Sequence, residues 1–98
     1  MITKEFKHWV EDIKKLIERR LTNCIGCEIW MAYGVPHNVI SIFVGFNCVK
    51  FWISFDQIEY DRNTKKQRRS LAKCRRQKLI MDIEDFSKEA TKIARRLK

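Results

Sequence analysis

The spacing of apolar residues changes near residue 25, and this change restricts the fold of the chain more than any other feature. Up to that point apolar side chains recur every three or four residues, which is the pattern of one buried helix face. The members of this pattern are Phe6, Trp9, Val10, Ile13, Leu16, Ile17 and Leu21. With Thr3 as the N-cap and Asn23 as the stop, the pattern predicts a helix over residues 3–22.

Beyond residue 25 the apolar spacing falls to two, which is typical of β-strands. The first predicted strand covers residues 25–33, and GVPHN, residues 34–38, has the composition of a turn. Two further strands are predicted over VISIFVGF, residues 39–46, and CVKFWISF, residues 48–55, with Gly45–Asn47 as their connection. Short connections between consecutive strands predict an antiparallel meander.

The two faces of this meander are predicted to differ. Alternate residues of the third strand are expected to pack against the first helix, namely Val49, Phe51, Ile53 and Phe55. The opposite face then carries aromatic, polar and charged side chains, which we expect another element to cover in part: Glu28, Trp30, Ser41, Phe43, Lys50 and Trp52.

Two helices are predicted after the strands, with DQIEYDRN, residues 56–63, as a connector. Thr64 and Gln67 have capping-box spacing, so we expect one helix across the basic residues that follow. A last helix is predicted over residues 82–98, which begin with acids and end with cations. The order is therefore α-β-β-β-α-α, and residues 1–98 form a single small α+β domain in which a three-stranded antiparallel meander packs against helices.

The net charge of +9 is concentrated in residues 62–78, and the rest of the chain is balanced. The cations of this segment are Arg62, Lys65, Lys66, Arg68, Arg69, Lys73, Arg75, Arg76 and Lys78, and it contains no acid. Charge of one sign at this density implies a polyanionic partner. The aromatic content of 11% excludes a disordered basic tail. Without a long apolar run the chain is predicted to be soluble and cytoplasmic, with no membrane partner.

We expect the basic segment to bind the phosphates of nucleic acid, with RNA favoured over DNA, because arginine-rich segments fold in RNA grooves. Trp30, Phe43 and Trp52 either stack on unpaired bases or belong to the core. The alternative is a small basic inhibitor or adaptor, of the kind that mobile elements or phages encode, which docks on an acidic face of a larger nucleic-acid-handling protein. The charge attracts both kinds of partner, and the sequence does not set the oligomeric state.

The sequence shows no catalytic constellation and predicts no cofactor, so we expect a protein that is not an enzyme. His8 and His37 are far apart in the chain, no serine lies in a nucleophile elbow, and the three glycines form no phosphate-binding loop. The chain has four cysteines, Cys24, Cys27, Cys48 and Cys74. Whether they bind zinc stays open, because Cys24 and Cys27 form one CxxC pair but a buried cysteine is also an ordinary core residue.

The order of elements and one turn resemble the double-stranded RNA-binding domains, which are α-β-β-β-α with a Gly-Pro-x-His type turn and a lysine-rich start to the last helix. GVPH, residues 34–37, falls in that turn, and KKQRR, residues 65–69, falls at the lysine run. Val35 separates the glycine from the proline here, and a further helix follows. The resemblance implies shape-selective binding of duplex RNA, with phosphate and minor-groove contacts from Lys65, Lys66, Arg69 and His37.

Overall fold

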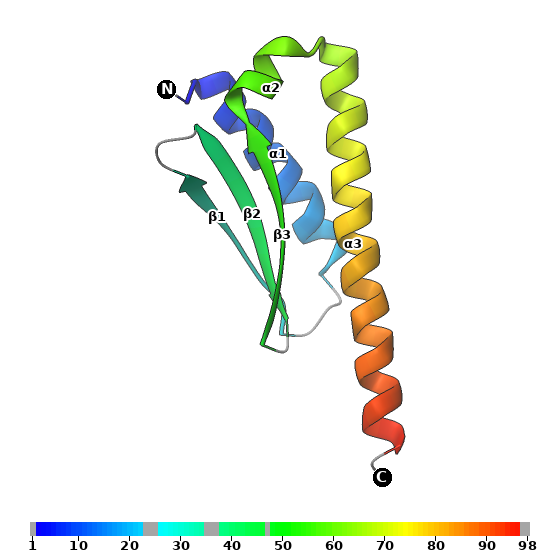
Figure 1. Cartoon of the computed structure of the whole chain (residues 1–98). Helices are drawn as coiled ribbons and strands as arrows, with labels where there is room; N and C mark the ends of the chain where they lie inside the picture. Colours follow the sequence, from blue (N-terminus) through cyan, green and yellow to red (C-terminus); the bar gives the residue numbers. More distant parts are fainter. Residues whose placement is uncertain (1, 23–25, 35–37, 47, 97–98) are drawn as a thin grey trace.

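The computed structural model describes residues 2–22, 26–34, 38–46 and 48–96, and at 93–95 the backbone alone. The elements follow the order α-β-β-β-α-α, so the predicted α+β fold is confirmed (Figure 1). They are α1 (Lys4–Arg20), β1 (Glu28–Gly34), β2 (Val39–Phe46), β3 (Val49–Asp56), α2 (Gln57–Arg62) and α3 (Lys65–Arg96).

Helix α1 begins where the sequence predicts. The hydroxyl of Thr3 accepts a hydrogen bond from the Phe6 backbone amide at 3.3 Å, which satisfies one of the amides that a helix start leaves unpaired. The predicted stop at Asn23 lies outside the described residues. Most of the apolar stripe is buried, but Trp9 is half-buried and Leu16 keeps 41% of its surface exposed. The apolar face of α1 therefore extends beyond the part of the helix that is buried in the core.

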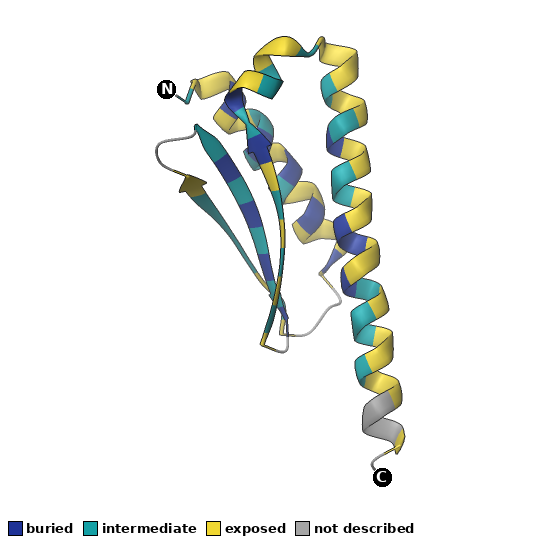
Figure 2. Cartoon of the chain, viewed as in Figure 1, coloured by how far each residue is buried: buried dark blue, intermediate teal, exposed yellow. Residues whose placement is uncertain are grey.

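The three strands form one antiparallel sheet in the order β1-β2-β3. Every second residue of the central strand is buried against the helices, as Figure 2 shows: Ile40, Ile42, Val44 and Phe46. Ile42 pairs with Met31 on one side and with Ile53 on the other, which continues the apolar face across the sheet. The predicted division of the strands into two faces is confirmed, but the apolar face of β3 packs mainly against α3 and not, as expected, against α1.

Two predicted strand limits differ in the structure. Gly45 belongs to β2, where it pairs with Lys50, so the predicted connection at Gly45–Asn47 is wrong. The chain reverses between the paired Phe46 and Val49, and Cys48 has a φ of 66°. Strand β1 begins at Glu28. Its predicted first residue, like residues 35–37 of the predicted turn, lies outside the described residues.

The predicted connector at residues 56–63 instead contains the short helix α2. Asp56 caps it by accepting a hydrogen bond from the Ile58 amide at 2.7 Å. Gln57 is buried, and its side-chain oxygen accepts from the Thr3 amide at 2.8 Å while its amide donates to Asp61 at 2.9 Å. Helix α2 therefore ties the start of α1 to the end of the sheet.

The two helices predicted after residue 64 are one continuous helix, α3, of 32 residues. The capping box at its start is confirmed, because Thr64 and Gln67 exchange hydrogen bonds at 2.8 and 3.2 Å. No glycine or proline lies between Lys78 and Asp82 to end a helix, and the intervening Leu79 and Ile80 are buried. The acids predicted to open a new helix therefore lie in the middle of α3.

Both long helices lie on one side of the sheet (Figure 1). Helix α1 packs against β2, and α3 packs against β3 and α1. Trp9 contacts Phe55 edge-on, with ring centroids 5.1 Å apart, and Phe86 of α3 does the same against Phe51 at 5.7 Å. Within the described part of the chain, no helix is long and apolar enough to span a membrane.

Candidate nucleic-acid interface

Three aromatic side chains form a row on the sheet face that points away from α1. Phe43 of β2 pairs directly with Trp30 of β1 and with Trp52 of β3, so the strand register places all three side by side. The ring centroids of Trp30 and Phe43 lie 5.5 Å apart with nearly parallel planes, and those of Phe43 and Trp52 lie 6.4 Å apart. We call Trp30, Phe43 and Trp52 the aromatic row.

A glycine makes room for this row. A Cβ atom on Gly45 would lie 3.3 Å from the six-membered ring of Trp30, which is closer than ordinary packing. The glycine therefore lets the Trp30 ring lie over the backbone of β2 and stack on Phe43. Sequence analysis missed this role, because it assigned Gly45 to a turn.

The aromatic row is open at the β3 end. Trp52 keeps 60% of its surface exposed, while Trp30 and Phe43 are half-buried against each other. The expectation that another element covers part of this face is wrong for the described residues, because α1 and α3 pack on the opposite face. The hydroxyls of Ser41 and Ser54 lie beside the row, 2.7 Å apart and exposed.

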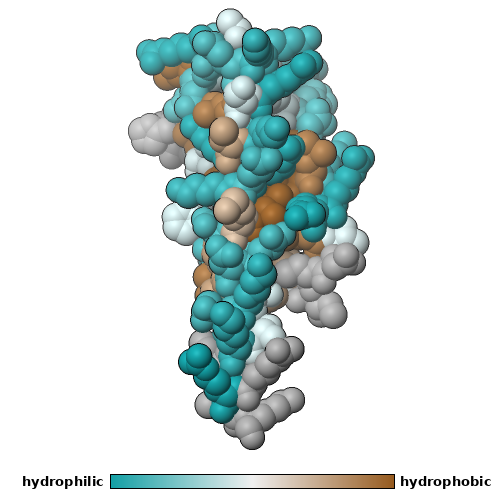
Figure 3. Space-filling view, turned by 90° about the vertical axis from the view of Figure 1, so that its right-hand side faces the viewer, coloured by the Kyte–Doolittle hydropathy of each residue, from teal (hydrophilic) through white to brown (hydrophobic). Residues whose placement is uncertain are grey.

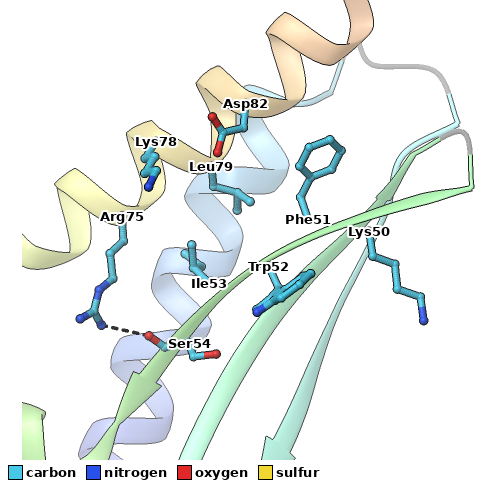
Figure 4. A pocket seen from close by; sticks show the side chains of 9 residues that line it. All are labelled: Lys50, Phe51, Trp52, Ile53, Ser54, Arg75, Lys78, Leu79 and Asp82. Carbon is cyan, nitrogen blue, oxygen red and sulfur yellow. Dashed lines mark hydrogen bonds between the residues drawn. The ribbon is translucent and has the colours of Figure 1, made fainter. Parts of the chain in front are cut away.

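A groove of about 410 Å³ separates β3 from α3 and continues from the aromatic row. Figure 4 shows the nine side chains that line it. Trp52 and Lys50 point away from α3, Phe51 and Ile53 point toward it, and α3 contributes Arg75, Lys78, Leu79 and Asp82. Trp52 thus lines this groove from β3 while its ring stays on the open face of the sheet, and α3 forms the other side of the groove.

Two cations of the basic segment make contacts within the protein. Arg75 donates two hydrogen bonds to the Glu59 carboxylate at 2.7 and 2.8 Å, and one to the Ser54 carbonyl at 2.9 Å. Arg68 donates to the Tyr60 carbonyl at 2.7 Å, and its guanidinium lies 3.8 Å from the centre of the Tyr60 ring. Both arginines therefore attach α3 to α2, and Arg75 also attaches it to β3, a role that charge density alone does not indicate.

The other predicted cations lie mainly on the surface. Arg76 is half-buried beside α1, and the remaining ones are exposed: Arg62, Lys65, Lys66, Arg69, Lys73 and Lys78. They point in several directions around α3, and Lys78 lines the groove beside the aromatic row. Lys50 is a further cation at this site. Sequence analysis placed it on the same face as Trp52 but did not include it among the binding residues.

Of the remaining sequence-predicted positions, the described ones do not join this site. His37 and Cys24 lie outside the described residues. Cys27 packs against the core, Cys48 lies at the β2–β3 turn, and Cys74 is exposed on α3. Among the described residues, no three His, Cys, Asp or Glu side chains come together in a way that could hold a metal ion.

Comparison of the chain with protein families, curated proteins and solved structures finds no match in any of the three. The function is therefore argued from the aromatic row, the groove and the exposed cations.

Proposed function

We propose that this protein is a non-enzymatic binding module for single-stranded nucleic acid, with RNA favoured over DNA. Unpaired bases stack on the aromatic row, and the adjoining phosphates contact the exposed cations of Lys50 and α3. The observation that supports this best is the direct continuity between the row and the groove, since Trp52 belongs to both. The site thus offers a surface for bases and a basic wall for phosphates next to each other.

The aromatic row favours an unpaired strand over a duplex, because Trp52 is 60% exposed on the open face of the sheet. Stacking on a ring requires a free base face, which a base inside a duplex does not offer. Each base stacked on an aromatic side chain contributes on the order of 1–3 kcal/mol, and this contribution depends little on sequence. A strand crossing the sheet along the row would meet all three rings in turn.

The serine pair supports the preference for RNA. A hydroxyl both donates and accepts hydrogen bonds, so a pair joined by one bond still offers donor and acceptor sites to a ligand. Ser41 and Ser54 lie two residue pairs along the strands from Phe43 and Trp52, and therefore on the same open face. A ribose 2′-hydroxyl on a strand bound to the row could be read there, and DNA lacks that group.

The test is a binding titration followed by fluorescence anisotropy. The ligands are labelled single-stranded RNA of about 12 nucleotides, the DNA of the same sequence, and duplex RNA, each over ~50 to ~200 mM salt. We expect single-stranded RNA to bind tightest, with log K falling by about 0.7 per log unit of salt for each phosphate contacted. Trp52→Ala should weaken binding roughly tenfold, and Trp52→Phe should retain most of it.

Two results would overturn the proposal. One is binding that Trp52→Ala leaves unchanged, which would show that charge alone attracts the ligand. The other is absence of binding by a folded protein, which would leave the inhibitor or adaptor hypothesis, with the row as an apolar surface for a protein. Preference for duplex RNA would instead support the resemblance to double-stranded RNA-binding domains.

A further inference from the structure

A second groove lies on the helical side of the molecule, between α1 and α3. Its volume is about 490 Å³, and its lining comes from Leu16, Arg20, Arg76, Gln77, Ile80, Met81 and Glu84. The two helices are joined along it by an ion pair, in which Arg20 lies 3.4 Å from Glu84. This surface lies on the helical side of the sheet, whereas the aromatic row lies on the other side (Figure 1). A ligand in the groove therefore leaves the row accessible.

The groove exposes large apolar side chains that the core does not use. Leu16 is 41% exposed and Met81 is 61% exposed, while Ile80 between them in the lining is nearly buried. Figure 3, which faces α3, shows apolar atoms gathered in a hollow beside the helix with hydrophilic side chains around them. An apolar surface rimmed by polar groups is typical of a site for a protein partner.

The charges around the groove are unequal. The charged side chains that line the groove carry an excess of one positive charge. Two cations line it, Arg20 and Arg76, against one acid, Glu84, and the chain as a whole carries a net charge of +9. A partner with acidic residues flanking an apolar stripe would complement this surface.

We propose that the α1–α3 groove binds an acidic amphipathic helix of a partner protein. A groove between two packed helices accepts a third helix, whose apolar residues at every third or fourth position reach Leu16 and Met81. The aliphatic side chains at the groove suit such a stripe and offer no ring on which bases could stack. A second copy of this chain fits less well, because two molecules of net charge +9 repel each other. This inference does not depend on nucleic-acid binding.

The test uses a designed peptide as the probe. A labelled helix of about 18 residues carries leucine at every third or fourth position and glutamate on its flanks, and it is titrated with the full chain. Two control peptides keep one feature each. A scrambled sequence of the same composition keeps the acidic charge but loses the apolar stripe. A peptide in which lysine replaces glutamate keeps the stripe but reverses the charge. Leu16→Gln and Met81→Gln remove apolar contacts without adding charge, and Met81→Leu is the matched control.

We expect the acidic amphipathic peptide to bind more tightly than either control peptide. Leu16→Gln and Met81→Gln should each weaken binding of this peptide roughly tenfold, as truncation of an interface anchor does. Met81→Leu and Trp52→Ala should change the affinity for the peptide little. The result with Trp52→Ala would show that the peptide binds at the groove and not at the aromatic row. Equal binding of the scrambled peptide, or binding insensitive to both glutamine variants, would overturn the proposal. So would a dimer of the protein, detected by sedimentation, that Met81→Gln dissociates.

Discussion

Replacing Arg75 by glutamine should destabilise the fold, although this residue lies in a segment whose charge suggests ligand binding. Its guanidinium joins three parts of the chain: it lies on α3, it forms a two-bond ion pair with Glu59 of α2, and it donates to the carbonyl of Ser54 on β3. It also lies 5.3 Å from the centre of the Phe55 ring. The substitution shortens the side chain and removes the charge, so it disrupts these contacts together.

The expected loss of stability follows from the exposure of the pair. The side chains of Arg75 and Glu59 are 30% and 35% exposed, which lies between a surface ion pair and a buried one. Surface pairs contribute about 0–1 kcal/mol, whereas hydrogen bonds to charged groups contribute about 1.5–3 kcal/mol. We therefore expect Arg75→Gln to lower the free energy of unfolding by about 1–2 kcal/mol. For a domain of this size, that loss lowers the melting temperature by about 5–15 °C.

The assay is urea unfolding followed by circular dichroism, with Lys78→Gln as the matched control. Lys78 lies on the same helix and its side chain is exposed, so its substitution should change stability by less than about 0.5 kcal/mol. A double-mutant cycle with Glu59→Gln should give a coupling energy of about 0.5 kcal/mol or more between Arg75 and Glu59. If Arg75→Gln is as neutral as Lys78→Gln, or the coupling is zero, then Arg75 does not attach α3 to α2.

Two further predictions concern residues that the tertiary structure made interpretable. Gly45→Ala should displace the Trp30 ring and weaken its stacking on Phe43, reducing the near-UV circular dichroism signal and lowering affinity for single-stranded RNA by roughly three- to tenfold. Gly34→Ala, where a Cβ would contact Val39 and not the row, is the control, and an unchanged signal in Gly45→Ala would contradict the argument. Gln57→Ala should cost about 1–3 kcal/mol of unfolding free energy, because the Thr3 amide loses its acceptor. Asp61→Ala, which leaves that acceptor in place, should cost clearly less in the same unfolding assay, and equal losses would contradict this reason.

Local patterns predicted most of the secondary structure correctly. The spacing of apolar residues located α1 and the three strands, and it also assigned the two faces of the sheet, because the side-chain period of a strand is independent of what the strand packs against. The capping box at Thr64 and Gln67 also located the start of α3, because its hydrogen bonds stay within one helical turn and do not depend on what the helix packs against.

The errors arose where a local signal competed with packing. Asp82, Glu84 and Asp85 match the acidic start of a helix, but α3 continues through them because Leu79, Ile80 and Ile83 keep one buried face along this part of the helix. The connector at residues 56–63 contains a helix because the buried Gln57 bonds to Thr3, which is 54 residues earlier in the chain. Contacts at such separations leave no periodic pattern in the sequence.

The sequence by itself determined the α+β order, the apolar face of each element and the concentration of cations in residues 62–78. Only the tertiary structure divided those cations into Arg68 and Arg75, which hold α3 in place, and the exposed ones, which are accessible to a ligand. It also aligned Trp30, Phe43 and Trp52 into one row and left that row on the sheet face opposite the two long helices. The physical reason is that periodicity depends on neighbouring residues, whereas strand register and the partners of long charged side chains depend on how distant segments pack.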